Sequence, residues 1–285
     1  MKRIGVCLAG TVITAGVLGQ ETGLPTRGTA ESPDGVEIRY EVSGSGSPPI
    51  VFVHGWSCDR TYWKEQIAHF SESHRVVAID LGGHGESGLG REDWTIEAFG
   101  ADVRAVLEAL DVRGAVFVGH SMGGPVIVEA AKLAPERVAA LVPVDHFQDV
   151  EHRVSPPELD AFLTPFRVEF STAVDEFVRG MFPARADPKL IDRIARDMAA
   201  APPEVAISAL ESVFRYDEAA GLASVRRPMR LLNADKWPTD LEAARRHRPD
   251  VELAVMPRVG HFLMAEDPAE FNRLLARAVR ELTSR

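Results

Sequence analysis

Ser121 lies at the centre of a G-H-S-M-G sequence, residues 119–123, between two apolar runs. Residues 115–118 are predicted to form a buried strand and residues 121–133 a helix, so the serine falls where a strand turns directly into a helix. A G-x-S-x-G sequence in that setting predicts a nucleophile elbow, because the glycines allow a tight turn that exposes the hydroxyl. The helix N-terminus would also favour negative charge developing beside it. The alternative is a glycine-rich turn in which the serine only caps the helix.

A serine hydroxyl is a weak nucleophile near neutral pH, so acyl-transfer chemistry would also need a base and an acid that orients it. The best candidate for the base is His261, which follows the last predicted strand, because the loops after parallel strands meet at one edge of a sheet. His120 adjoins the serine, but neighbours on a turn do not share a face. Two aspartates that end strands, Asp145 and Asp235, both give the chain order serine, acid, histidine. On this reasoning both remain candidates for the acid.

The tetrahedral oxyanion of acyl transfer needs two backbone donors. One is expected to be the N–H of Met122, the residue after the serine. The other is expected from the loop after the strand at residues 50–53, with the N–H of Trp56 as the best candidate. His54, at the start of that loop, is interpreted as a structural brace.

Buried strands and helices alternate along most of the chain. Strands are predicted at residues 36–42, 50–53, 75–80, 115–118, 138–144, 229–232 and 251–255, and helices at residues 62–70, 96–110, 121–133 and 267–282. Short apolar strands separated by helices predict a mostly parallel sheet covered by helices on both faces, an α/β fold. Residues 20–33 are interpreted as a flexible lead-in.

Residues 146–225 interrupt this alternation. They contain no convincing strand, and their spacing predicts four helices at about residues 157–166, 172–181, 188–199 and 203–214. We therefore divide the chain into an α/β core, residues 20–145 and 226–285, and a helical cap inserted between two of its strands, residues 146–225.

Four sequences carry a resemblance to a known family: V-F-V-H-G-W at residues 51–56, D-L-G-G-H-G-E-S-G at 80–88, G-H-S-M-G-G at 119–124 and G-H-F-L-M-A-E-D-P at 260–268. With them the chain resembles an α/β-hydrolase of the capped type, related to esterases, C–C bond hydrolases and haloalkane dehalogenases. The resemblance runs from about residue 36 to residue 282 and implies an eight-stranded sheet. Dehalogenases and epoxide hydrolases of this fold use an aspartate nucleophile, whereas this chain has a serine.

The resemblance also bears on the acid. Most relatives place the acid in a G-x-x-D segment after the second-last strand, and here that position holds Lys236. The segment Asn233-Ala234-Asp235 resembles relatives that take the acid from the end of the preceding strand, where this chain has Asp145. Asp145 is therefore preferred over Asp235, and Ser121, His261 and Asp145 form the predicted triad.

The substrate is expected to be a small molecule bound under the cap. Phenylalanines are frequent in and beside residues 146–225, and Phe147, Phe262 and Trp237 are predicted to line the pocket. An apolar pocket for a small or aromatic ester follows, although phenylalanines at helical spacing usually pack a cap onto its core. The predicted function is a serine hydrolase that cleaves an ester or related carbonyl bond through an acyl-enzyme. The alternatives are a ligand-binding receptor of this fold with slow turnover, or a C–C bond hydrolase.

Several function classes are disfavoured by the sequence. The formal net charge of −10 argues against a nucleic-acid or anionic-membrane partner. The G-x-G-x-x-G spacing at residues 83–88 follows a strand but does not open into a helix, so it does not predict a dinucleotide site. The histidines show no H-E-x-x-H spacing and no cysteine partner, so neither a metal nor a cofactor is predicted.

Residues 1–19 are predicted to be a secretory signal peptide. Lys2 and Arg3 precede an uncharged stretch rich in apolar and small residues, which is the pattern of such a signal. The alternatives are a buried first strand or an uncleaved anchor. Cleavage before Gln20 would give an exported, periplasmic or secreted protein without a membrane span. It would leave Cys58 as the only cysteine, unable to form an internal disulfide.

Overall fold

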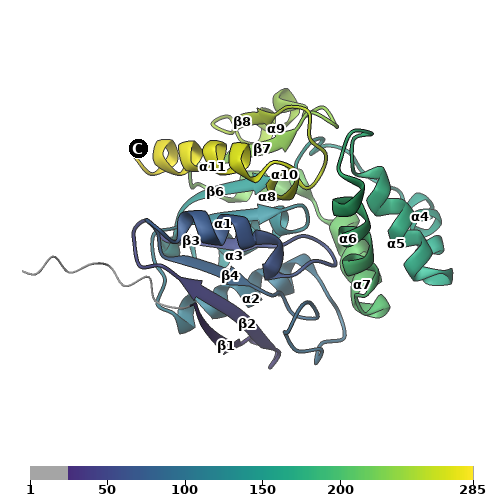
Figure 1. Ribbon diagram of the computed structural model, residues 1–285, viewed down its shortest axis with the longest axis horizontal. Helices are drawn as coiled ribbons and strands as arrows, with labels where there is room; N and C mark the ends of the chain where they lie inside the picture. The colour runs from purple at the N-terminus through teal and green to yellow at the C-terminus, as the bar shows by residue number, and fades with distance from the viewer. Residues whose placement is uncertain (1–24, 285) are drawn as a thin grey trace, which may run out of the picture.

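A computed structural model describes residues 25–284 of the chain, and its centre is an eight-stranded, mostly parallel sheet (Figure 1). The strands are β1 (Thr26–Glu31), β2 (Glu37–Ser43), β3 (Ile50–Val53), β4 (Val76–Ile79), β5 (Ala115–His120), β6 (Val138–Val144), β7 (Arg230–Ala234) and β8 (Glu252–Met256). Their order across the sheet is β1-β2-β4-β3-β5-β6-β7-β8. β2 alone runs opposite to the other seven strands, so its pairings with β1 and β4 are antiparallel, whereas β3 to β8 all pair in parallel. The predicted fold class is confirmed.

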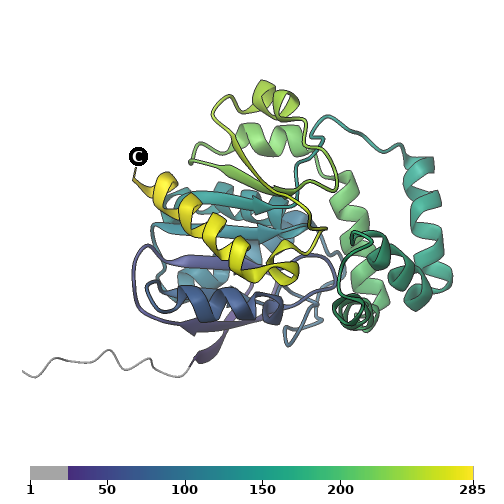
Figure 2. The same cartoon turned by 45° about the horizontal axis from the view of Figure 1, so that its top comes forward.

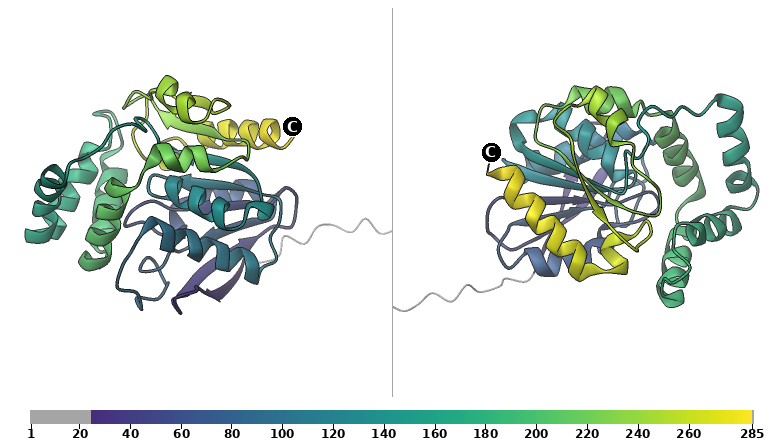
Figure 3. Two further views of the ribbon diagram at one scale, coloured as in Figure 1. Left: turned by 180° about the vertical axis from the view of Figure 1, so that it is seen from behind. Right: turned by 90° about the horizontal axis from the view of Figure 1, so that it is seen from above.

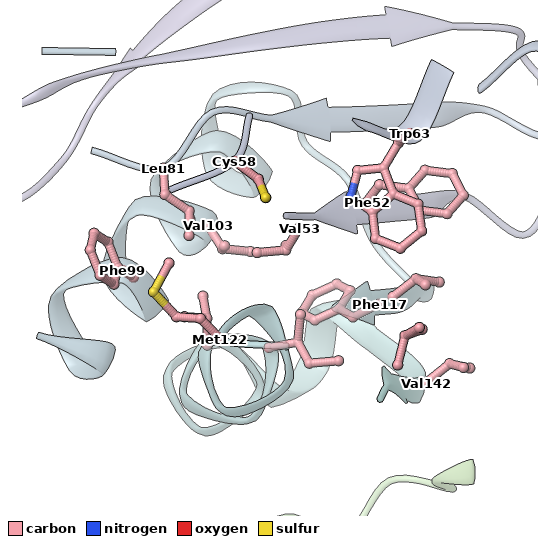
Figure 4. Close-up of a cluster of buried hydrophobic side chains, with 14 of the residues drawn as sticks. Phe52, Val53, Cys58, Trp63, Leu81, Phe99, Val103, Phe117, Met122 and Val142 are labelled. Atoms are coloured by element: carbon pink, nitrogen blue, oxygen red, sulfur yellow. The ribbon is translucent and has the colours of Figure 1, made fainter. Parts of the chain in front are cut away.

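Helices cover both faces of the sheet, as the apolar character of the strands requires. Every residue of β3, β4 and β5 is buried, so neither face of these strands can be left to water. One face is covered by α1 (Lys64–Phe70) and α11 (Pro268–Thr283), and the other by α2 (Ile96–Ala109) and α3 (Gly123–Leu133) (Figures 1 and 3). The remaining short helices of this part are η1 (Arg60–Trp63), η2 (Pro135–Arg137), α9 (Leu241–His247) and α10 (Leu263–Glu266). Figure 4 shows part of the resulting core, where the ring of Phe52 stacks on Trp63 and Phe117 lies on the adjacent strand.

The first strand corrects the expectation of a flexible lead-in over residues 20–33. Residues 26–31 form β1, which pairs antiparallel with β2 from Thr26 opposite Val42 to Glu31 opposite Glu37. The sequence of β1, T-R-G-T-A-E, holds a single apolar residue, Ala30, so it lacks the alternation that identifies a strand. Main-chain pairing to β2 stabilises this edge strand instead, and such pairing leaves no trace in the sequence of one strand.

The segment between β6 and β7 is entirely helical or irregular. It contains α4 (Pro156–Val168), α5 (Phe170–Gly180), α6 (Pro188–Ala199), α7 (Pro203–Arg215) and α8 (Glu218–Ser224). In Figures 1 and 2 the helices α4 to α7 form a lobe beyond one end of the sheet, and we call this lobe the cap. Proline begins α4, α6 and α7, where its missing N–H costs no hydrogen bond. The short helix α8 packs instead against α3 and α9.

No helix within residues 25–284 is both long and apolar enough to cross a bilayer. The predicted signal peptide, residues 1–19, lies outside the residues that the structure describes.

Candidate active site

Ser121 occupies a strained turn between β5 and α3. Its φ angle is +52°, in the left-handed region that a residue with a Cβ adopts at a cost of about 1–3 kcal/mol. Its N–H donates to the carbonyl oxygen of Val144 at 2.9 Å, which ties the turn to the end of β6. A Cβ at Gly119 would lie 2.0 Å from the carbonyl oxygen of Gly123, so only glycine fits there. The turn therefore has the geometry of a nucleophile elbow.

His261 and Asp145 form a buried pair beside this turn. His261 Nδ1 lies 2.6 Å from Asp145 Oδ2, and the two residues are 9% and 2% exposed. The other carboxylate oxygen, Oδ1, accepts the N–H of Ala234 at 2.8 Å, so Asp145 is held in place on both sides. A carboxylate on Nδ1 holds the proton there, which leaves the lone pair of Nε2 available as a base.

Asp235 lies elsewhere. Its side chain is exposed, and Oδ1 accepts the N–H of Arg258 at 2.8 Å in the loop after β8. Of the two aspartates that the sequence left open, the structure brings Asp145 to His261 and makes Asp235 a turn residue.

Three residues, Met181, His120 and Glu266, form hydrogen bonds with the backbone around His261. Its N–H donates to the carbonyl oxygen of Met181 in the cap at 3.1 Å, and its own carbonyl oxygen accepts from His120 Nε2 at 2.8 Å. The Glu266 carboxylate accepts the N–H of the preceding Gly260 at 2.9 and 3.0 Å. Burial keeps the pKa of His120 well below its usual value, so the ring is neutral and one nitrogen is free to donate.

Sequence reasoning did not identify Met181 or Glu266 as supports of His261. The position of Glu266 in the G-H-F-L-M-A-E-D-P sequence was a usable signal, because an acid just after the histidine can reach back to the preceding N–H. The contact of Met181 comes from the cap, 80 residues earlier in the chain, and no local pattern marks it.

Trp56 and Met122, the predicted oxyanion donors, both line the space next to Ser121. Their side chains are buried, Met122 among core residues (Figure 4), and Trp56 Nε1 donates to the carbonyl oxygen of Ala206 in α7 at 2.6 Å. Within residues 25–284 neither backbone N–H of the two donates a hydrogen bond. Two unpaired donors at the edge of a cavity suit a developing oxyanion.

His54 braces the loop that carries Trp56. Its Nε2 accepts the N–H of Leu81 at 3.0 Å and its Nδ1 donates to the carbonyl oxygen of Gly55 at 2.8 Å. Burial lowers the pKa of His54 to about 4, which keeps the ring neutral in these roles.

A cavity of about 400 Å³ joins these groups and lies between the sheet edge and the cap. Ser121, His261, Asp145, Trp56 and Met122 all line it. The cap contributes an apolar wall, made of Phe177, Met181, Met198, Leu210, Val213 and Phe214. The site can therefore hold an apolar group next to a serine, a histidine and two free N–H donors.

The three predicted pocket residues have different positions. Phe262 lines the cavity, and Trp237 lines it with its ring 5.8 Å from that of His261. Phe147 does not line the cavity, which corrects the prediction. Phe147 has a left-handed backbone, with φ +60°, and its side chain is fully buried. The preceding residue, His146, lines the cavity instead.

The cap phenylalanines divide between packing and lining. Phe162, Phe166 and Phe177 form a cluster of ring contacts that reaches Trp56. Of the three only Phe177 is among the lining residues. Both interpretations offered by the sequence therefore hold, each for part of the set.

Comparison with known proteins places this geometry in a family. Residues 50–274 match the model of the Alpha/beta hydrolase family. A thermophilic esterase from Thermogutta terrifontis superposes with a TM-score of 0.79 at 26% identity, over 90% of this chain and 99% of the esterase. Est816, described as an N-acyl homoserine lactone degrading enzyme, superposes with a TM-score of 0.76 at 29% identity, over 87% of this chain and 99% of that protein.

A non-heme chloroperoxidase from Streptomyces lividans is 41% identical over 118 residues, which are 40% of this chain and 43% of that protein. The chain spans less than two thirds of the length of the first curated relatives that it matches. The family model, by contrast, covers most of the chain, from β3 to α11, and includes Ser121, Asp145 and His261. The chain belongs to the alpha/beta hydrolase family.

Proposed function

We propose that the protein is a serine hydrolase that cleaves an ester or related carbonyl bond of a small, largely apolar substrate. The observation that carries this proposal is the 2.6 Å contact between His261 Nδ1 and Asp145 Oδ2, in a cavity that Ser121 also lines. The similarity to an esterase and to a lactone-degrading enzyme supports a carbonyl substrate with an oxygen leaving group.

In the proposed mechanism, Ser121 Oγ attacks the substrate carbonyl carbon while His261 Nε2 takes the hydroxyl proton. Asp145 stabilises the imidazolium that forms. The backbone N–H groups of Trp56 and Met122 stabilise the oxyanion of the tetrahedral intermediate. Collapse of that intermediate expels the alcohol, which receives the proton from His261, and leaves an acyl-enzyme. A water molecule, deprotonated by His261, then releases the acid and restores the serine.

A panel of 4-nitrophenyl esters, together with unsubstituted amides and lactones, tests this function. We expect many turnovers per protein molecule on short- and medium-chain esters, because the cavity of about 400 Å³ has an apolar wall suited to an alkyl chain. For the 4-nitrophenyl esters, the release of 4-nitrophenol and the intact mass of the protein are measured together. A single equivalent of 4-nitrophenol, with a stable mass increase on the protein, would instead support a receptor that is modified once.

We also propose that the protein is exported and that residues 1–19 are removed. The basic start and the uncharged stretch before Gln20 support this. Mature protein recovered from the periplasm or medium of an expressing bacterium is expected to begin near Gln20 by mass spectrometry. Soluble cytoplasmic protein that keeps Met1 would contradict the proposal.

A further inference from the structure

The cavity has a second, polar wall, made of residues that lie outside the helices α4 to α7. It is formed by five residues, which we call the polar wall: His146, Gln148, Asp149, His152 and Glu218. The first four follow β6 directly, and Glu218 begins α8. His146 Nε2 lies within ion-pair distance of Glu218 Oε1, at 3.1 Å, and makes no hydrogen bond with any residue that the structure describes. Asp149 and His152 line the cavity and are exposed.

The polar wall keeps hydrogen-bonding capacity for a ligand. Within the part of the chain that the structure describes, the side chains of Gln148 and Asp149 form no hydrogen bond or ion pair. Tyr216, which also lines the cavity, is different, because its hydroxyl already donates to Glu129 Oε1 at 2.7 Å. A ligand group on this side would therefore meet a free carboxylate and a free amide.

Among the described residues, the aspartate, glutamate, lysine and arginine side chains that line the cavity are all of one sign. Three carboxylates line it: Asp145, Asp149 and Glu218. Among residues 25–284 no lysine or arginine lines it.

Two cations in adjoining segments have other partners. Arg153 donates to Asp217 and to the carbonyl oxygens of Val150 and His152, and Lys236 donates to the carbonyl oxygen of Phe182. Among residues 25–284, a negatively charged substrate would thus meet three lining carboxylates and no lysine or arginine in the lining itself.

We propose that the polar wall selects substrates by charge: the site takes esters whose alcohol part is neutral or cationic, and it rejects those whose alcohol part is anionic. This inference rests on the proposed function, since it names the substrate class of the same site. Opposite or like charges within several ångströms change binding measurably in a partly enclosed cavity, and the exposure of Asp149 moderates the effect through solvent screening.

Three butanoate esters of similar shape test the proposal. They are the butanoate esters of choline (cationic), 3,3-dimethylbutan-1-ol (neutral) and 3-hydroxypropanoate (anionic). Each enzymatic rate is divided by the rate of hydroxide-catalysed hydrolysis of the same ester, which corrects for intrinsic reactivity. We expect kcat/KM for the neutral ester to exceed that for the anionic ester roughly tenfold or more, and the cationic ester to be at least as good as the neutral one. Salt at about 0.5 M should reduce these ratios, because it screens exposed charge.

Two variants connect the selection to the polar wall. Asp149→Asn and Glu218→Gln should each lower the cationic-to-anionic ratio, by roughly fivefold to tenfold. Glu72→Gln, which removes one exposed carboxylate that does not line the cavity, should leave the ratio within about twofold. Asp149 lies in an exposed loop, so its variant keeps the test valid if Glu218→Gln disturbs the start of α8.

The affinity of the Ser121→Ala variant for each ester can be measured through the fluorescence of Trp56 and Trp237. These affinities should rank the three esters in the same order as kcat/KM, without any turnover. This separates the two proposals: failure to turn over any ester would contradict the function alone. Charge selection is overturned if wild-type protein hydrolyses, or the serine variant binds, the anionic ester as well as the neutral one. It is also overturned if neither polar-wall variant changes the ratio.

Discussion

Ser121→Ala is expected to remove turnover on every ester of the panel while leaving the protein folded. By analogy with other serine triads the loss in kcat is about 10⁶-fold, because the variant lacks the hydroxyl that forms the acyl-enzyme. The side chain contributes no hydrogen bond to the described structure; the backbone of Ser121 ties the elbow to β6, and alanine retains that contact. Steady-state rates and a thermal melt on the same preparation measure both parts of the expectation.

Cys58 provides the matched control, since it also lines the cavity and carries a thiol, a second kind of nucleophile. It is 5% exposed, and burial raises the pKa of its thiol, so little of the reactive thiolate forms. Cys58→Ala is expected to cost no more than about tenfold, through altered packing rather than lost chemistry. If Ser121→Ala kept a tenth of the wild-type rate, or if Cys58→Ala were the inactive variant, the serine mechanism would be wrong.

The parallel part of the sheet was predictable because its strands are buried on both faces. No position of I-V-F-V in β3 or of V-V-A-I in β4 is exposed, so these strands consist of apolar residues throughout. Such a continuous apolar run can be recognised in the sequence. The edge strand β1 has one buried apolar residue, Ala30, and is defined by its pairing with β2. Its existence therefore depends on a partner strand, and only the family resemblance implied an eighth strand.

In the candidate site, too, some residues could be identified from the sequence and others could not. Ser121 and His261 were identifiable because each sits in a short sequence whose neighbours fix the local turn. The local sequence could not decide between Asp145 and Asp235 as the acid, since both follow buried strands. In the structure the backbone turns at Asp145, with φ +48°, and its carboxylate contacts His261. Phe147 was misassigned for a related reason, because the same turn sends its ring into the core and the ring of His146 into the cavity.

Asp145→Asn is expected to lower kcat about 10⁴-fold, by analogy with the same change in other serine triads. The asparagine oxygen can still accept the N–H of Ala234, so its amide NH₂ would take the place of Oδ2 and donate to His261 Nδ1. His261 would then carry its proton on Nε2, where it cannot accept one from Ser121. The imidazolium would also lose its counter-charge.

Asp235→Asn is the control for this change, because it removes the same charge from the other aspartate. Its Oδ1 only accepts the N–H of Arg258 in an exposed turn, and an amide oxygen can do the same, so we expect less than about 1 kcal/mol of lost stability and little lost activity. Rates of both variants are compared at equal folded fraction, since a destabilised protein would imitate a defective site. The reverse ranking would assign the acid to Asp235. Equal, small losses in both would mean that neither carboxylate orients His261, although the 2.6 Å contact with Asp145 predicts the larger loss there.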